Sequence, residues 1–239
     1  MTRLQFIWQR ILDVFRFLPK RLSRLFYHFW IFRYSTRIAN QVSNKLHIFI
    51  IWLLELKLLI LEIFGIGETY DILTTLFKRS TVPLSEKQLQ IAIGFYGNAS
   101  IFRKVRIDEK AILGMGKMAT AYVSCFTINT GAPIPDDVLI HELVHVIQYK
   151  KYGLRYMTRA LYGQNWGGGY NYGGVEGLEN WQKSAKENYF FNPEQEAEFI
   201  TDLYLLTQKR PTGWFGRDLP QSIQTSYTPR KVLGSEHLV

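Results

Sequence analysis

The spacing of apolar side chains divides the chain into three parts. Along residues 1–45, aromatic and aliphatic side chains recur at helical spacing among Lys and Arg, and Pro19 interrupts the pattern, which predicts two helices rather than one. Residues 46–66 are the most apolar stretch and predict one long helix. From residue 79 onward the apolar runs are shorter and fall into both helical and strand-like patterns.

The part after residue 79 predicts a mixture of helices and short strands. Val, Ile, Thr and aromatic side chains at 104–108 and 119–129 favour strands. Three helices are expected to begin at side chains that can cap them: Ser85, Asp136 or Asp137, and Asn192. The predicted fold class is therefore α+β, mostly helical, with a small β element.

Composition sets the expected domain boundaries. Polar residues and Pro83 interrupt the apolar pattern at 78–88, and the chain after Lys209 is rich in Pro, Gly, Ser and Thr. We expect a basic, aromatic-rich helical region at 1–78, a folded domain at 79–208, and an extended or mobile tail at 209–239.

The positive charge of the chain is concentrated near its first residues. The formal net charge is +9, and residues 1–45 carry nine Lys and Arg against one acid, Asp13. Because these basic residues lie among large apolar side chains, nucleic acid is a poor candidate partner, and residues 1–66 are typical of a membrane-surface segment. The alternative is a helical hairpin that packs on the rest of the chain through its aromatic face.

Residues 46–66 are long enough to span a membrane, but Glu55, Lys57 and Glu62 lie inside the stretch. Charged groups are unfavourable in a bilayer, so a helix on the membrane surface or in the protein core is at least as well supported. The apolar run is too long and too far from Met1 for a cleavable signal peptide. We expect a membrane-associated chain, or one secreted by a non-classical route.

The sequence HELVH at 141–145 carries the candidate chemistry. On a helix, His141 and His145 face the same way and can bind one metal ion, while Glu142 can act as general base on a metal-bound water. Most other positions of this helix are apolar, so the three polar groups would be buried and would need partners. By chance the motif would arise in roughly one such chain per hundred, so it needs a third ligand as support.

A catalytic zinc requires that third protein ligand, and the candidates lie downstream. His237 falls in the tail and is a poor candidate. In the predicted helix NPEQEAEFITD, Glu194 and Glu198 share a face with Asp202 one turn further, and Glu196 points away from it. We expect Glu194 to be the ligand and Glu198 or Asp202 to hydrogen-bond a ligand histidine.

These motifs resemble the gluzincins, zinc peptidases in which H-E-x-x-H is followed by a distant glutamate in an E-x-x-A setting, here Glu194 to Ala197. Residues 83–204 are more closely similar to the peptidase domain of vgr-related proteins and to a domain of unknown function in proteins of extracellular contractile injection systems. The matching pieces are PLSEKQLQIAIGFYGNASIFRKVRI, LIHELVHVIQY and NPEQEAEFITDLY. The resemblance implies a bacterial protein with a zincin-like catalytic domain, in which His141, His145 and Glu194 bind zinc and Glu142 is catalytic.

The predicted function is hydrolysis of a peptide or protein substrate by a zinc-activated water, with Glu142 as base. Tyr170 and Tyr172, in the glycine-rich loop 163–174, are candidates for stabilising the oxyanion, and this loop could act as a lid. Two alternatives remain open. The zincin fold could be catalytically silent, with a structural, delivery or self-processing role in a secretion or toxin system, or residues 1–66 could act on membranes themselves.

Overall fold

The structure is a computed structural model of the 239-residue chain. It describes the following residues: 2–38, 45–78, 80–97, 100–111, 121–184 and 191–214. Within them, side chains are described except at 31–38, 45–48 and 180–184. His237 and the predicted tail beyond residue 214 lie outside the described residues.

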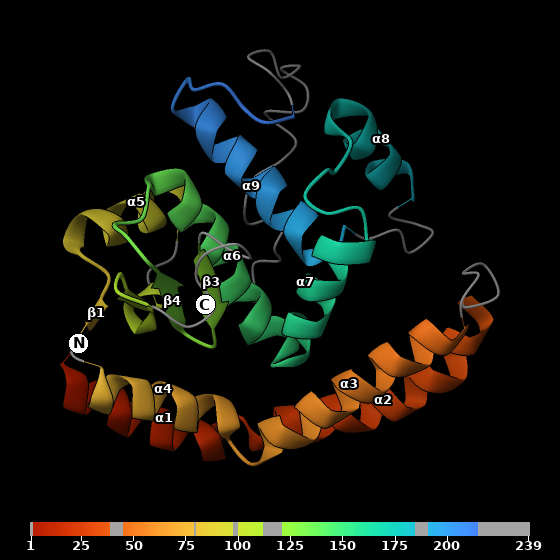
Figure 1. Ribbon diagram of the computed structural model, residues 1–239, viewed down its shortest axis with the longest axis horizontal. Helices are drawn as coiled ribbons and strands as arrows, with labels where there is room; N and C mark the ends of the chain where they lie inside the picture. Colours follow the sequence, from red (N-terminus) through yellow and green to blue (C-terminus); the bar gives the residue numbers. More distant parts are fainter. Residues whose placement is uncertain are drawn as a thin grey trace.

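Four helices run along one edge of the molecule (Figure 1). They are α1 (Arg3–Arg16), α2 (Leu18–Ile38), α3 (Lys45–Ile63) and α4 (Ile66–Phe77). Helix α1 packs beside α4 and helix α2 beside α3, so the four form two side-by-side pairs. Helix α1 ends before Pro19 and α2 begins with Pro19 in its first turn, which confirms the predicted interruption. We call these four helices the α1–α4 layer.

A small sheet follows the α1–α4 layer. Its strands are β1 (Thr81–Pro83), β2 (Arg106–Asp108), β3 (Ala121–Ser124) and β4 (Thr127–Thr130). They lie in the order β1-β2-β4-β3, with β2 and β4 parallel and the other two pairs antiparallel. The predicted strand at 104–108 is confirmed as β2.

The second predicted strand region, 119–129, contains a tight hairpin. Strands β3 and β4 pair with Ser124 opposite Thr127, so that only Cys125 and Phe126 form the turn. Cys125 has a φ of 58°, the positive value that the first turn residue of a two-residue hairpin requires. Its thiol is buried, so the turn closes against the core rather than toward solvent.

Helices make up most of the remaining chain, which together with the sheet confirms the expected mostly helical α+β composition. They are α5 (Glu86–Tyr96), the short 3₁₀ helix η2 (Phe102–Lys104), α6 (Asp136–Tyr152), α7 (Arg155–Trp166), α8 (Gly174–Ser184) and α9 (Pro193–Thr207). Helix α6 runs through the centre of the body and packs along α9 more extensively than any other pair of described elements (Figure 1). The consecutive side chains of Leu143 and Val144 are fully buried, so α6 is enclosed on several sides.

Two of the three predicted helix caps are confirmed. Ser85 accepts a hydrogen bond from the backbone of Gln88, and Asn192 accepts two from the first turn of α9. The cap predicted for α6 is wrong, because Pro135 occupies the cap position. Asp136 and Asp137 lie inside the first turn, where their negative charge still favours the positive end of the helix dipole.

The α1–α4 layer faces the rest of the molecule with charged side chains. Arg10 of α1 is fully buried, 3.2 Å from Glu68 and 2.9 Å from Asp71 of α4. Asp71 in turn accepts a hydrogen bond from the Thr127 hydroxyl of β4, at 3.2 Å. The ion pairs of Arg10 thus join α1 to α4 within the layer, and the bond from Thr127 to Asp71 links the layer to the body. Phe6 of α1 is fully buried as well, so the layer packs through both charged and aromatic side chains.

The acids inside α3 face the body in the same way. Glu55 pairs with Arg159 of α7 at 2.7 Å, and Glu62 pairs with Arg24 of α2. Both carboxylates are buried, and their spacing of seven residues places them on one face, as predicted. Throughout the part of the chain that the structure describes, no helix has the length and apolar character needed to cross a membrane.

Candidate metal site

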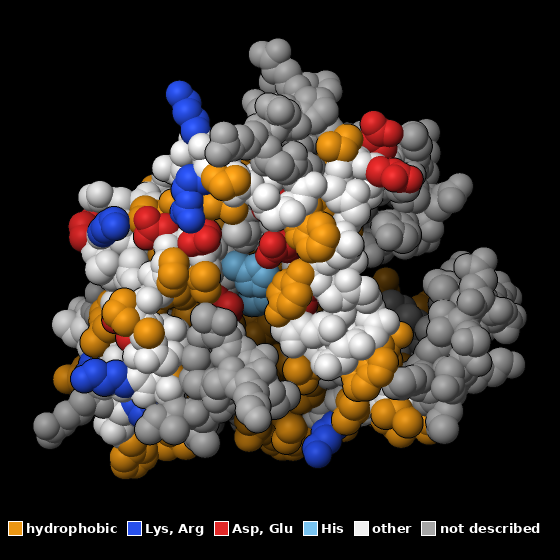
Figure 2. Space-filling model, turned by 45° about the horizontal axis from the view of Figure 1, so that its top comes forward, with side chains coloured by type: hydrophobic (Ala, Val, Ile, Leu, Met, Phe, Trp, Pro, Cys, Tyr) orange, Lys and Arg blue, Asp and Glu red, His pale blue; other side chains and the backbone are white. Residues whose placement is uncertain are grey.

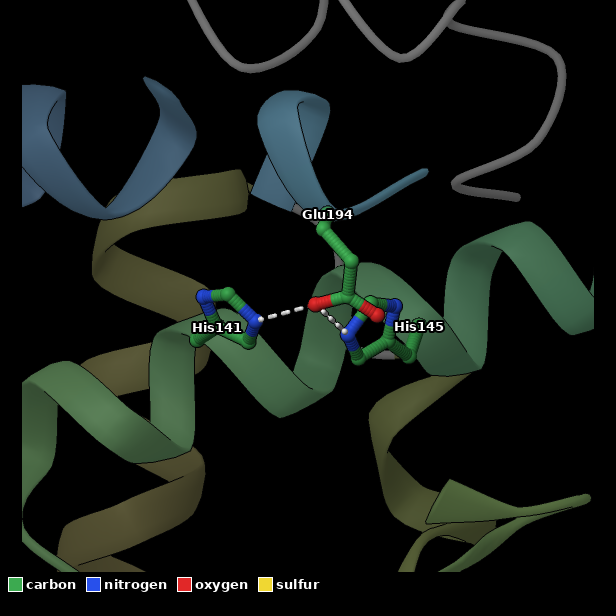
Figure 3. Close-up of side chains that lie close together, drawn as sticks. All are labelled: His141, His145 and Glu194. Atoms are coloured by element: carbon green, nitrogen blue, oxygen red, sulfur yellow. Dashed lines mark hydrogen bonds and ion pairs between the residues drawn. The ribbon is translucent and has the colours of Figure 1, made fainter. Parts of the chain in front are cut away.

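Two packed helices bring the candidate ligands together. His141 and His145 lie one turn apart on α6, and Glu194 lies in the first turn of α9. One carboxylate oxygen, Oε2 of Glu194, is 3.4 Å from Nε2 of His141 and 3.5 Å from Nε2 of His145 (Figure 3). The ligand atoms of all three residues lie within 4.8 Å of one another, so this cluster could hold a metal ion.

The separations between Glu194 and the two histidines are long for charge-assisted hydrogen bonds, and they match those of ligands around one shared ion. A charge-assisted N–H···O bond is about 2.7–2.9 Å long, shorter than both separations between Glu194 and the histidines. Ligands that surround a tetrahedral zinc at about 2.0–2.1 Å are about 3.3–3.4 Å apart. The donor set of two imidazoles and one carboxylate is also one that zinc accepts. The residues present therefore fit a metal ion of this kind.

Gln148 holds the ring of His145 in one tautomer. Its Nε2 donates to the Pro193 carbonyl at 3.0 Å and to Glu196 Oε2 at 2.8 Å. The amide orientation is thereby defined, and Oε1 of Gln148 is left to accept a hydrogen bond from Nδ1 of His145, at 2.8 Å. With its proton on Nδ1, His145 presents the lone pair of Nε2 toward Glu194.

Glu198 takes the corresponding position beside His141. Its Oε2 lies 3.5 Å from Nδ1 of that ring, which leaves Nε2 of His141 directed toward Glu194. On the other side, Gln164 of α7 donates to Oε1 of Glu194 at 3.0 Å. Each of the three ligand side chains is thus held through the atom that faces away from the common point, and its other atom is directed toward that point.

The electrostatics of the cluster favour a cation between the ligands. Burial by itself would raise the pKa of Glu194, but the neighbouring His145 and His141 outweigh burial and lower this pKa to about 2. Burial would lower the pKa of His141, yet its hydrogen bonds to Glu194 and Glu198 raise the pKa to about 10. The Glu194 carboxylate therefore stays ionised and draws positive charge into the site, which is the role that a metal ion would take over.

Glu142 is buried beside the two histidines. Only 5% of its surface is exposed, and its Oε2 has no hydrogen-bond partner among the described residues. Burial raises the pKa of this carboxyl group, and the nearby histidines oppose the increase. A buried ionisable oxygen without a partner is unfavourable in a folded protein, and this one lies beside the candidate ligands.

The structure separates the two candidate tyrosines. The ring of Tyr170 lies 5.9 Å from that of His141, and its hydroxyl accepts a hydrogen bond from Gln164. Tyr172 is buried, and its hydroxyl donates to Asp202 at 2.6 Å. Asp202 also accepts hydrogen bonds from the backbone of 213–214, so its contacts lie on the Tyr172 side. Of the predicted supporting residues, Glu198 and Tyr170 therefore adjoin the cluster.

The cluster lies at the bottom of a hollow in the surface. Figure 2 shows histidine side chains there, bordered by acidic and apolar side chains. The glycine-rich loop is tied to α9 beside this hollow, because Asn192 donates hydrogen bonds to the carbonyls of Gly167 and Gly169, and Gln195 donates to that of Asn171. The same first turn of α9 therefore positions both Glu194 and the loop.

Two supporting residues were not anticipated from the sequence. Gln148 follows His145 by three positions on one helix, a spacing that places the two side chains on the same face. This contact could therefore have been predicted from the sequence. Gln164 reaches Glu194 from a different helix, and no local spacing indicates that contact.

Fold and site together define a mostly helical α+β protein with a candidate metal site of two histidines and one glutamate. No protein family, curated protein or solved structure matches this chain. The resemblance to gluzincins and to vgr-related proteins therefore stays a prediction.

Proposed function

We propose that this chain is a zinc metallopeptidase of the zincin type. The observation that carries the proposal is the convergence of His141, His145 and Glu194 on one point, with Glu142 buried beside it. Two imidazoles, one carboxylate and a general base on the same helix turn are the parts such an enzyme needs. A peptide or protein segment that enters the hollow above the histidines would be the substrate.

A zinc ion in this position would supply a Lewis acid and lower the pKa of a bound water toward about 7. The protein side of the mechanism rests on its own residues. Glu142 accepts a proton at Oε2, the oxygen that no described residue engages. Gln148 and Glu198 keep both imidazole Nε2 atoms directed at the site, which fixes the ligand geometry before substrate enters.

Metal content of the full-length protein tests the proposal. We expect about one zinc per chain by elemental analysis, and its loss in His141→Ala and Glu194→Ala. Glu176→Ala, an exposed glutamate on α8, is the matched control and should keep the metal. A folded wild-type protein without bound zinc would overturn the proposal, and loss in His141→Ala alone would move the third ligand to another carboxylate.

We further propose that the α1–α4 layer rests on a membrane surface. Among the described residues, 25 large apolar side chains are exposed, and 20 of them lie between Leu4 and Phe77. Soluble monomers rarely expose such large apolar patches. Aromatic side chains combined with a strongly basic segment are typical of helices that lie in the membrane interface, and residues 1–45 carry most of the net charge. This placement would bring the peptidase to membrane-bound substrates.

Phe15 and Phe77 provide the test, because their side chains are 71% and 80% exposed. We expect the double variant Phe15→Ser/Phe77→Ser to keep its thermal stability and to lose at least about tenfold in vesicle binding, since burial of one such side chain contributes about 1.5–3 kcal/mol. The control is Leu161→Ser on α7, which should bind like wild type. A wild-type protein that ignores vesicles and forms a stable dimer would assign the apolar face to a second copy.

A further inference from the structure

A second cavity lies where the α1–α4 layer meets the body, away from the candidate metal ligands. It has a volume of about 420 Å³ and lies between the α1–α2 junction, η2 and the last turns of α6. Its charged lining is strongly basic: Arg16, Lys20, Arg21, Arg24, Lys104 and Lys150 against Glu62 and Glu68. The lining thus has a net charge of +4, and no candidate metal ligand belongs to it.

The two carboxylates are already engaged by the innermost arginines. Arg21 is 2.6 Å from Glu68, and Arg24 pairs with Glu62. The Nε groups of both arginines are buried and have no hydrogen-bond partner among the described residues. Arg21 is 2% exposed. Its buried Nε donor therefore lies at a cavity whose two carboxylates, Glu62 and Glu68, are already paired with arginines.

The remaining basic groups repel one another. The pKa of Lys20 is lowered by burial and then by Arg24. The pKa of Lys150 is lowered by burial and then by three neighbouring cations of the same lining, Lys104, Lys20 and Arg16. Like charges held together at a protein surface are relieved by an anion that binds between them.

We propose that this cavity binds a phosphate-bearing anion. Arginine forks match the geometry of phosphate oxygens, and lysines add positive charge around them. The cavity lies where the α1–α4 layer meets the body, and a helix is about 10–12 Å in diameter. If the apolar face of that layer is sunk about 5–10 Å into a membrane, the cavity lies near the level of the head groups. The phosphate can thus come from a phospholipid or from a soluble phosphate ester.

The test compares full-length variants that remove two charges each. Lys20→Gln/Lys104→Gln removes charges from the cavity, and Arg16→Gln/Lys20→Gln is a second variant that changes only exposed residues. Lys57→Gln/Lys87→Gln is the control, because both lysines are exposed and outside the cavity lining. One arm measures sedimentation with phosphatidylcholine vesicles, with and without phosphatidylglycerol. The other measures thermal stabilisation by inorganic phosphate and glycerol phosphate.

We expect the cavity variants to lose at least about tenfold in affinity for the anionic vesicles, and the control to lose clearly less. A loss of phosphate stabilisation in the cavity variants alone would support the proposal with a soluble phosphate ester as ligand. Equal losses in cavity and control variants would overturn the proposal, because they would show general surface attraction. A wild-type protein that responds to neither probe would overturn it as well.

Discussion

The α6–α9 pair and the α1–α4 layer both bury charged side chains, but they arrange them differently. At the metal site, the free atoms of His141, His145 and Glu194 face one common point, and their other atoms are held by neighbours. In the layer, Arg10 instead lies directly against Glu68 and Asp71. The first arrangement directs ligand atoms at a space that an ion could fill, whereas the second pairs opposite charges directly.

The largest effect should come from Glu142→Gln, because it removes the proposed base and keeps the shape of the side chain. We expect peptide hydrolysis to fall by about 10²–10⁴-fold, with the metal content unchanged. Cleavage of a peptide library by the purified full-length protein, with zinc measured on the same sample, checks this. Undiminished cleavage by the variant would show that Glu142 is not the base, whereas a wild-type protein that cleaves no peptide would favour a catalytically silent module.

In the α1–α4 layer, Arg10→Met should act on stability rather than on chemistry. The substitution leaves the buried acids Glu68 and Asp71 without their central cation, and breaking a buried pair from one side costs about 3–5 kcal/mol. Urea unfolding measures the change, with Arg16→Met on the exposed side of the same helix as control, for which about 0.5 kcal/mol or less is expected. If both variants are equally stable, the ion pairs do not hold α1 against α4.

The two regions also differ in how far the sequence predicts them. The ligands of the metal site follow from positions four apart on one helix and from a shared face on another, which are local relations. The layer depends on contacts between residues such as Arg10 and Glu68, which are far apart in the chain. No local spacing indicates that pairing, just as none indicated the contact between Gln164 and Glu194.

The apolar pattern of α1 shows why the helix could be predicted from the sequence while its orientation was left open between two alternatives. Leu4 and Phe15 recur at helical spacing, yet they are 78% and 71% exposed, whereas Arg10 and Asp13 are buried. The usual inference places the apolar stripe against the core because it assumes water on the opposite side. That assumption fails when the acids of a partner helix neutralise the polar face.

The stability of the α1–α4 layer should depend on pH through its buried carboxyl group, Asp71. Burial raises the pKa of Asp71 to about 7, although Arg10 opposes the increase. A carboxyl group whose pKa is raised in the folded state loses stability as the pH rises from its ordinary value, about 4, through the raised value. The stability difference between Asp71→Asn and wild type should therefore shift in favour of the variant as the pH rises across this window, by on the order of a few kcal/mol. Parallel urea-unfolding profiles from pH 4 to 7 would contradict this.

The smallest effect belongs to the support of the metal site. Gln148→Leu removes the acceptor that holds Nδ1 of His145 and leaves all three ligands in place. Loss of such a partner weakens metal binding by about 10–100-fold, measured by competition with a zinc chelator. Gln208→Leu, exposed just beyond α9, is the control and should bind zinc like wild type. If Gln148→Leu also binds zinc like wild type, packing alone holds the ring of His145. The contrast with the α1–α4 layer, where direct contacts between charged side chains hold the helices, would then be weaker.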